Sequence, residues 1–287
     1  MNSTTSKGEN VVKRNIMRWP GFRRKAVTLS YDDGTVFDKK LIEIMDKYGL
    51  KGTFNINSGE FGSGRRLSKE DAYELYAGSP HEVAVHGVYH LALSLAPTAR
   101  GVADVINDRV ALEDMFGRPV CGMAYANGTY DDDAVEILRL SGIDYSRTTA
   151  ATEKFDVPVD WLRMPATCHH RNPRLMELAE KFIEDEGKRD FWWSPPRLFY
   201  LWGHSYEFND NDNWDVIEKF GEYIGGRDDI WYATNGEIYD YVKAFDSLKF
   251  SANGKFVHNP SAIDVCICLK DDYLIPAGKT VEVKVVY

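Results

Sequence analysis

Apolar and polar positions along the chain alternate between two spacings, one typical of buried strands and one typical of amphipathic helices. The first pair is an apolar-rich run at 25–31 followed by a stretch at 37–48 whose apolar residues recur at helical spacing. Predicted strands lie at 25–31, 52–57, 82–86, 120–125, 144–148, 161–165, 197–202 and near 230, and predicted helices at 37–48, 68–77, 98–116, 132–141, 173–184, 214–224 and up to 245. This repeated alternation predicts parallel strands with helices outside, and the number of units favours a closed, distorted (β/α) barrel over an open sheet.

The pattern changes after residue 246. Short strand-like runs at 262–269 and 280–286, separated by turn signals such as Asn253-Gly254, carry no helical spacing. We therefore expect three parts: an N-terminal lead-in at 1–24, a catalytic (β/α) barrel domain at 25–246, and a small C-terminal β appendage at 247–287.

Charge and composition exclude several classes of partner. The 287 residues carry a net charge of -9 and a single short basic cluster at 18–25, which disfavours nucleic acid and anionic membranes. No apolar run approaches the roughly 20 residues that span a bilayer. The polar N-terminus lacks the apolar core of a secretion signal, so we expect a cytoplasmic protein unless a signal has been trimmed. The four scattered cysteines are predicted to be free thiols.

Two adjacent carboxylates, Asp32 and Asp33, follow the first predicted strand directly. Like charges side by side at a strand end repel each other and lose solvation energy when buried, so a compensating partner is expected. An Asx-turn in Asp-Asp-Gly accounts for the residue types without any function. A divalent cation bound to Asp33 explains both carboxylates, because it leaves Asp32 free to accept a proton.

Histidines follow two further predicted strands. His86 and His90 are four residues apart, a spacing at which both imidazoles can face one metal ion, and Asp33 would complete a site with positions open for water. A helix cap and a packed loop histidine are the alternative for this pair. His204 follows an apolar strand and is a candidate general acid. On this interpretation the metal lowers the pKa of a bound water molecule, and Asp32 assists its attack on a carbonyl.

These motifs resemble those of the polysaccharide deacetylases, the metal-dependent carbohydrate esterases of the NodB-homology type. The resemblance covers about 25–245 and is carried by SYDDG at 30–34, HGVYH at 86–90 and LWGH at 201–204. It implies a distorted (β/α) barrel, Asp32 as catalytic base, His204 as catalytic acid, and a metal held by Asp33, His86 and His90. The metal it implies is Zn²⁺ or a similar ion (Co²⁺, Ni²⁺ or Mn²⁺).

Two departures from the family leave roles open. Where the family usually has R-x-P-x-G, with an arginine that orients the base, the chain has Ala124-Tyr-Ala-Asn-Gly128, and either Arg163 or Arg147 is a candidate replacement. The backbone N–H of the Tyr125 segment is a candidate for holding an oxyanion. Asp160, in an imperfect D-x-x-D-W motif, is a candidate to support His204.

Aromatic and polar residues near the expected rim are candidates for sugar contacts, with core packing as the alternative for the aromatics. The aromatic residues are Trp192, Trp193, Trp202 and Tyr206, and the polar residues beside His204 are Glu207 and Asn209. The pair His169-His170 could also contact a sugar but is more readily explained as a solvated loop pair.

The function we expect is metal-dependent removal of acetyl groups from N- or O-acetylated carbohydrate. An alternative is an allantoinase-like amidohydrolase acting on a small cyclic amide or ureide, and a third reading is a non-catalytic carbohydrate-binding barrel. The expected partner is thus an acetylated carbohydrate or a small amide. The sequence leaves the substrate, the metal, the role of the appendage and the oligomeric state undetermined.

Overall fold

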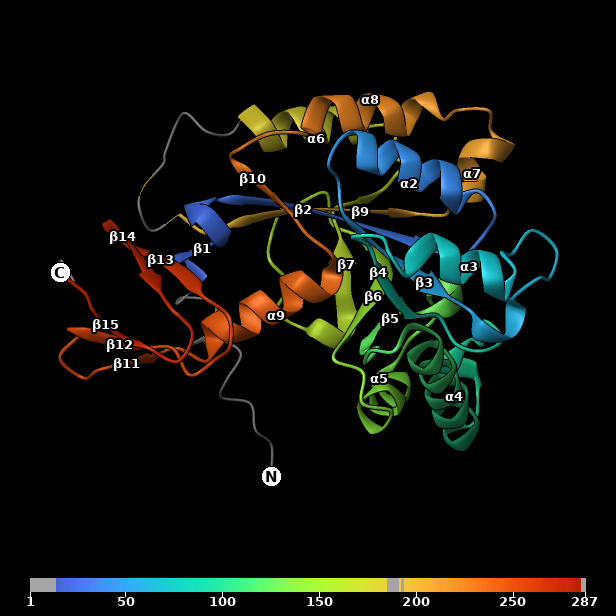
Figure 1. The fold of residues 1–287 in the computed structure, drawn as a ribbon, viewed down its shortest axis with the longest axis horizontal. Helices are drawn as coiled ribbons and strands as arrows, with labels where there is room; N and C mark the ends of the chain where they lie inside the picture. The colour runs from blue at the N-terminus through green and yellow to red at the C-terminus, as the bar shows by residue number, and fades with distance from the viewer. Residues whose placement is uncertain (1–13, 185–190, 192–193, 285–287) are drawn as a thin grey trace.

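The computed structural model describes residues 14–184, 191 and 194–284, and shows a strongly curved sheet with helices on its outer side (Figure 1). Trp192 and Trp193, two of the aromatics considered for sugar binding, lie outside the described residues. The strands of the sheet are β2 (Lys25–Asp32), β3 (Gly52–Ile56), β4 (Glu82–Val85), β5 (Gly122–Ala124), β6 (Tyr145–Ala151), β7 (Met164–Ala166), β8 (Cys168–His169), β9 (Arg197–Gly203) and β10 (Ile230–Tyr232). Every pairing in it is parallel, as the alternation predicts.

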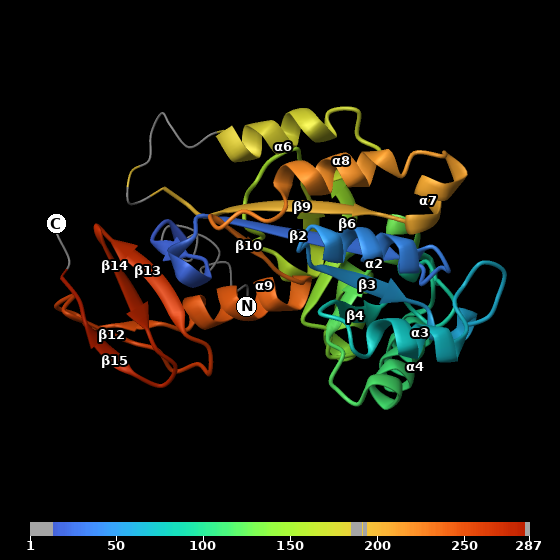
Figure 2. The same ribbon diagram turned by 45° about the horizontal axis from the view of Figure 1, so that its top comes forward.

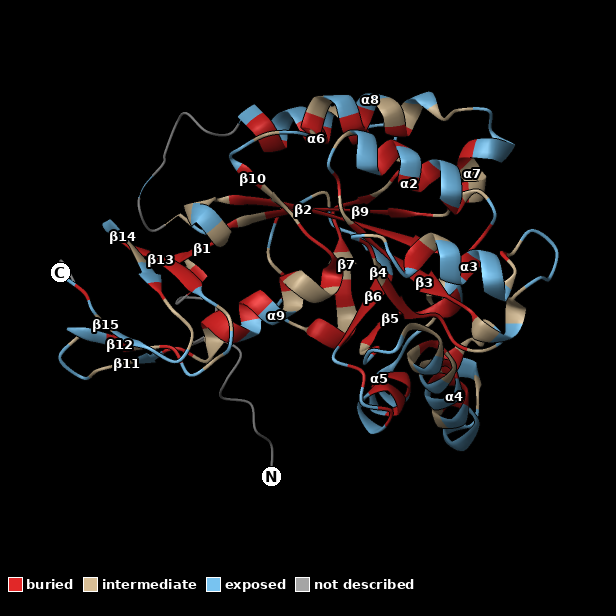
Figure 3. Ribbon diagram, viewed as in Figure 1, coloured by how far each residue is buried: buried red, intermediate tan, exposed pale blue. Residues whose placement is uncertain are grey.

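Helices connect the strands and cover the sheet from outside (Figure 2). They are α2 (Asp38–Lys47), α3 (Lys69–Tyr76), α4 (Thr98–Phe116), α5 (Asp132–Leu140), α6 (Leu175–Glu184), α7 (Ser205–Asp210), α8 (Asp215–Ile224) and α9 (Asn235–Asp246). Each longer helix turns its apolar stripe inward, for example Ile217, Phe220 and Ile224 of α8, whereas the outer faces are exposed (Figure 3). No helix in the described part of the chain is long and apolar enough to cross a membrane.

One short segment closes the sheet into a barrel. Strands are ordered β7-β6-β5-β4-β3-β2-β9-β8, and β7 and β8 are consecutive in the chain, separated only by Thr167. The Thr167 N–H donates to the carbonyl of Tyr200 in β9 (2.9 Å). Residues 164–169 therefore pair with β6 on one side and β9 on the other. The predicted (β/α) barrel is confirmed, and it is distorted because this closing segment is broken and β10 pairs with the start of β2, outside the ring.

The small strands at the C-terminus form two antiparallel sheets. One contains β11 (Lys249–Phe250), β12 (Phe256–His258) and β15 (Thr280–Glu282); the other contains β13 (Val265–Leu269) and β14 (Asp271–Ile275). The second sheet is completed by β1 (Met17–Arg18), which comes from the predicted lead-in and pairs with β13. Both sheets thus lie near the start of β2, at the opposite end of that strand from Asp32 (Figure 1).

Buried apolar side chains join the small sheets to the barrel. Trp19, Tyr200, Tyr241 and Ile267, all almost fully buried, belong to one apolar cluster that includes strands of both parts. All four cysteines are free, as predicted, including the pair in β13.

Candidate metal centre and active site

Asp32 and Asp33 lie at the carboxyl end of β2, and the backbone there turns their side chains apart. Asp32 is the last residue of the strand, in register with Asn55 of β3. Asp33 has a left-handed backbone conformation (φ 85°), fixed by its N–H, which donates to the carbonyl of Asn55 (2.9 Å). A non-glycine residue in this conformation is strained and is often found at functional sites. Both carboxylates are buried, so each needs a partner of its own.

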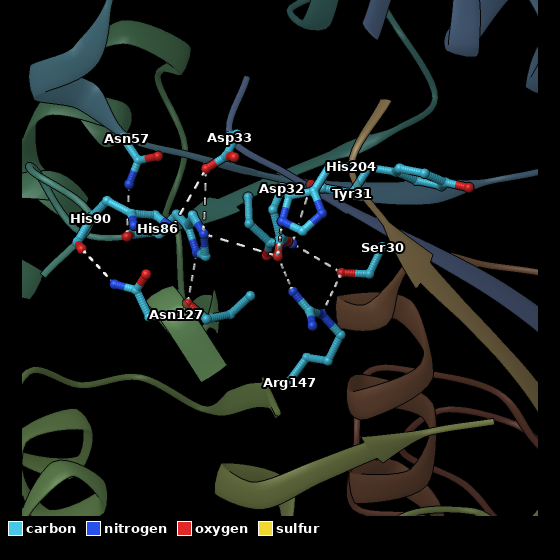
Figure 4. A network of polar contacts seen from close by, with 12 residues as sticks. Ser30, Tyr31, Asp32, Asp33, Asn57, His86, His90, Asn127, Arg147 and His204 are labelled. Atoms are coloured by element: carbon cyan, nitrogen blue, oxygen red, sulfur yellow. Dashed lines mark hydrogen bonds and ion pairs between the residues drawn. The ribbon is translucent and has the colours of Figure 1, made fainter. Parts of the chain in front are cut away.

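His86 and His90 bring their imidazoles to Asp33 (Figure 4). His86 Nε2 lies 3.8 Å and His90 Nε2 3.6 Å from Asp33 Oδ1. The other ring nitrogen of His86 is 2.9 Å from the carbonyl of Ala124, which can only accept, so Nδ1 carries the proton and the lone pair of Nε2 faces Asp33. Burial lowers the pKa of His86, which keeps the ring neutral. His90, like Asp33, has a left-handed backbone (φ 54°).

Neighbouring polar groups fix the loop that carries these histidines. The carboxylate of Asp108, in α4, accepts from the N–H of His86 (3.0 Å) and from that of Ser58 (2.8 Å). Asn57 donates to the carbonyl of His86 (2.8 Å). The backbone that carries His86 is thus held from both sides.

The donor set of Asp33, His86 and His90 fits a divalent cation. Their ligand atoms, one carboxylate oxygen and two imidazole nitrogens, lie close enough together to surround one ion. Asp33 Oδ1 and His86 Nε2 are buried and accept no hydrogen bond, although Arg66 Nη2 lies 3.1 Å from Asp33 Oδ1. The lone pair of His86 Nε2 is therefore left for a ligand. Two histidines and a carboxylate with open positions are typical of sites for Zn²⁺ and other transition metals.

Asp32 is held in its ionised form. The Arg147 guanidinium contacts Asp32 Oδ2, and Asn55 Nδ2 donates to Asp32 Oδ1 (2.8 Å). Burial alone would raise the pKa of Asp32, but the charge of Arg147, with His86 and His204 nearby, lowers it to about 2. Asp32 is thus a positioned carboxylate that can accept a proton at neutral pH.

The structure resolves the choice between the two candidate arginines. Arg163 pairs with Asp132 and with Asp160 (3.0 Å), outside the cluster around Asp32. Arg147, on β6, is in register with Ala124 of β5, the position at which the family pattern has its arginine. The guanidinium of Arg147 therefore reaches Asp32 from the neighbouring strand. Its central carbon lies 4.2 Å from the centroid of the Trp202 ring.

His204 faces Asp32 from the other side of the site. It follows β9 directly and is the N-cap residue of α7, and its Nε2 lies 3.9 Å from Asp32 Oδ2. Its Nδ1 is 3.2 Å from Glu207 Oε2, so the carboxylate holds the proton on that nitrogen. Burial would lower the pKa of His204, but the bond to Glu207 and the charges of Asp32 and Asp33 raise it above the ordinary value.

The carboxylate of Glu207 lies beside three imidazoles. Besides His204, the Nε2 atoms of His169 (3.1 Å) and His170 (3.2 Å) lie beside its carboxylate. Burial would raise the pKa of Glu207, yet these contacts hold it well below its usual range. His169, His170 and Glu207 have donor types that suit a metal, but the N–H of Arg171 donates to His169 Nδ1 (3.1 Å). The proton of a neutral His169 is therefore on Nε2, which faces Glu207. Both ring nitrogens of the buried His170 lack a hydrogen-bond partner among the described residues.

The structure places two predicted supporting residues, Asp160 and Tyr125, in other contacts. Asp160 contacts Arg163 and not His204, because the carboxylate that supports His204 comes from the next turn of its own chain segment, Glu207. The N–H of Tyr125 itself donates to the carbonyl of Arg147 (3.1 Å) within the barrel, so a backbone donor for an oxyanion would have to be a later residue of this segment, such as Asn127. The hydroxyl of Tyr125 donates to the carbonyl of Leu162 (2.9 Å), so this side chain is also used for packing.

Trp202, in β9, lies beside two of the histidines described above. Its ring is 4.4 Å, centroid to centroid, from that of His169 and 5.9 Å from that of His204, in edge-on arrangements. Asn55 and Arg66, by contrast, were not among the predicted site residues. Asn55 stood in a run that also reads as an ordinary buried strand, and only the strand register places it beside Asp32.

Comparison with known proteins agrees with the motifs. Residues 21–146 match the family model described as Polysaccharide deacetylase. The resemblance is confirmed for this part of the chain. The matched residues include Asp32, Asp33, His86 and His90 and end just before Arg147. The match gives no support to the allantoinase-like alternative.

Solved structures share the fold. The chain is similar to a candidate polysaccharide deacetylase from Mycobacterium smegmatis, with 17% identity and a TM-score of 0.61 over 80% of this chain and 93% of that one. Two further similar structures were solved in complex with acetate. One is a family 4 carbohydrate esterase from Streptomyces lividans, with 12% identity and a TM-score of 0.48 over 74% of this chain and 93% of that one. The other is the deacetylase PplD from Streptococcus pyogenes, with 21% identity and a TM-score of 0.48 over 55% of this chain and 70% of that one. At these identities the likeness shows the fold alone. No curated protein matches the chain.

Proposed function

We propose that the protein is a metal-dependent hydrolase that removes acetyl groups from N- or O-acetylated carbohydrate, with Zn²⁺ as the metal. One observation carries the proposal: the Asp33-His86-His90 donor set lies directly beside an ionised carboxylate, Asp32, and a histidine, His204, whose proton position is fixed. The match of residues 21–146 to polysaccharide deacetylases supports the same reaction class.

The residues divide the work of acyl transfer between them. Asp33, His86 and His90 would hold a divalent ion, which would supply a Lewis acid and lower the pKa of a water molecule. Asp32 accepts the proton of the attacking water, and its low pKa keeps it available for this. Arg147 and Asn55 each bind one oxygen of Asp32 and so fix its direction.

Departure of the sugar requires a proton on its nitrogen or oxygen. His204 Nε2 faces the same space as Asp32, and Glu207 favours the protonated imidazole. His204 therefore donates the proton to the leaving group. Because the base and the acid are separate residues on opposite sides of the site, neither has to exchange roles during the reaction.

The test is acetate release from a panel of N- and O-acetylated oligosaccharides, with and without a chelator. We expect chelator-sensitive acetate from the wild type. We expect none from His90→Gln, which removes a metal donor, or from Asp32→Asn, which keeps the metal. The control is His258→Gln, a histidine beside Thr280 in the small C-terminal sheet. Undiminished acetate release from Asp32→Asn, or from chelator-treated protein, contradicts the proposal.

A further inference from the structure

Arg66 contributes a positive charge to the site that the mechanism above does not use. Its Nη2 lies 3.1 Å from Asp33 Oδ1, outside hydrogen-bonding geometry, and the side chain is 21% exposed. Within the described residues Asp33 is the carboxylate with which it forms an ion pair. Asp32 already has Arg147 as its partner.

The backbone holds Arg66 firmly in this place. Arg66 and Thr35 form an isolated β-bridge, and the N–H of Val36 donates to the carbonyl of Arg65 (2.9 Å). The N–H of Leu67 donates to the carbonyl of Gly34 (2.9 Å). The segment around Arg66 is therefore joined to the turn that carries Asp33.

Arg66 lines an open depression of about 370 Å³ next to the metal donors. The other lining residues are Asp33, Thr35, Ser63, Arg65 and Tyr206. Asp33 belongs to both the depression and the donor set, so the depression adjoins the place that an acetyl group would reach at the metal. The lining side chains are polar apart from the ring of Tyr206, which suits a polar substituent rather than an apolar one.

The charges in the depression do not cancel once Asp33 binds a metal. Arg65 is paired with Asp210 through both of its terminal nitrogens and lies over the ring of Tyr206 (5.1 Å), so its charge is compensated. Among the described residues, the ion pair of Arg66 is with Asp33, whose negative charge a bound cation would take up. The nearby Asp38 is buried behind Tyr76 and Ser205. This local excess of positive charge contrasts with the net charge of -9 of the whole chain.

We propose that this depression binds an anionic substituent of the acetylated sugar, a carboxylate or a phosphate, with Arg66 as the main ligand. The proposal rests on the proposed function, because it names the substrate class of the same site. A guanidinium presents paired donors that match either oxyanion, and charge-assisted hydrogen bonds are roughly twice as strong as neutral ones. Arg66 would thus determine specificity.

The experiment compares acetate release from N-acetylglucosamine with release from its 1-phosphate, its 6-phosphate and its 6-carboxylate. We expect kcat/KM to be at least about tenfold higher for an anionic sugar in the wild type, as for a single charge-assisted contact. In Arg66→Gln the ratio of anionic to neutral kcat/KM falls close to one, and Arg66→Lys restores part of it. Arg139→Gln, which removes an arginine from the exposed face of α5, leaves the ratio unchanged. The phosphate and carboxylate arms identify which anion is preferred.

Binding and metal content separate this proposal from the proposed function. Titration calorimetry of metal-loaded Asp32→Asn should show tighter binding of the anionic sugar, and the preference should vanish in the Asp32→Asn/Arg66→Gln double variant. Equal rates for neutral and anionic sugars overturn the anion subsite and leave the deacetylase function intact. Anion-selective binding without acetate from any sugar supports the subsite and contradicts the function. Loss of metal from Arg66→Gln overturns the subsite, since Arg66 would then serve to hold Asp33.

Discussion

Asp32 and Asp33 are neighbours in sequence, yet the structure gives them different partners. Asp33 is turned by its left-handed backbone towards two imidazoles, whereas Asp32 stays in the strand and meets Arg147 and Asn55. The cost of burying two like charges is thus offset separately for each. One carboxylate is suited to binding a cation and the other to accepting a proton.

Arg147 is expected to be the residue that orients the base. Replacing it with Gln should lower kcat/KM for acetate release by about 100-fold, because a misdirected base costs about that much. The loss of its charge raises the pKa of Asp32, so the acidic limb of the pH–rate profile should move to higher pH. Arg163→Gln is the matched control, since Arg163 pairs with Asp132 and Asp160 elsewhere. A larger loss in Arg163→Gln than in Arg147→Gln would refute this assignment.

Glu207 is expected to set the pH range of the acid. The pKa of His204 is raised above its ordinary value, so activity should persist until the pH rises through that pKa and the imidazole loses its proton. Glu207→Gln removes the carboxylate, lowers the pKa of His204 and should move the alkaline limb of kcat/KM to lower pH, with at least a tenfold loss at pH 8. Glu218→Gln, on the exposed side of α8, provides the control. An unmoved alkaline limb would exclude Glu207 from this role.

At the scale of elements, one buried carboxyl group joins three helices. Asp38, in the first turn of α2, accepts from the hydroxyl of Tyr76 in α3 (2.6 Å) and from that of Ser205 in α7. Burial raises the pKa of Asp38 to about 7 despite these hydrogen bonds. Below pH 7 the neutral acid is therefore the form that the folded metal-free protein favours.

Stability should consequently depend on pH through Asp38. Because its folded-state pKa is above the unfolded value near 4, its contribution is fully present below pH 4 and is lost as the pH rises through 7. The free energy of unfolding of the metal-free protein can be measured by urea unfolding at pH 5.5 and at pH 8.5. Over this range it should fall by about 2 kcal/mol more in the wild type than in Asp38→Asn, whose amide does not titrate. Parallel pH dependences of the two proteins would show that Asp38 is ionised throughout.

The elements that follow a clear periodicity were predicted well. The helix predicted at 98–116 has the same bounds in the structure, and Ser68 caps α3 by accepting from the N–H of Asp71 (3.0 Å). The six-residue helix α7 was not predicted, because it is too short to show a helical period. Arg147 was left as one of two candidates, since both arginines lie in short predicted strands and only the register with Ala124 shows which of them reaches Asp32.

At the scale of the whole molecule, the barrel places its chemistry at one end and its added sheets at the other. Asp33, His86 and His204 follow β2, β4 and β9, so their strands meet at one edge, as the alternation of strands and helices predicts. The pairing of β1 with β13 could not be predicted from the sequence, because a two-residue strand in a polar lead-in shows no periodicity. The small sheets lie away from the site and have no residue among its partners described above.

The central claim is that one divalent ion, bound by Asp33, His86 and His90, makes the site active. It is tested most directly by adding Zn²⁺ in measured amounts to metal-depleted protein while following acetate release from an acetylated oligosaccharide. The account predicts a linear rise in activity that saturates at one equivalent per chain, and no rise in His90→Gln. Full activity before any metal is added, or activation of His90→Gln at the same single equivalent, would contradict it.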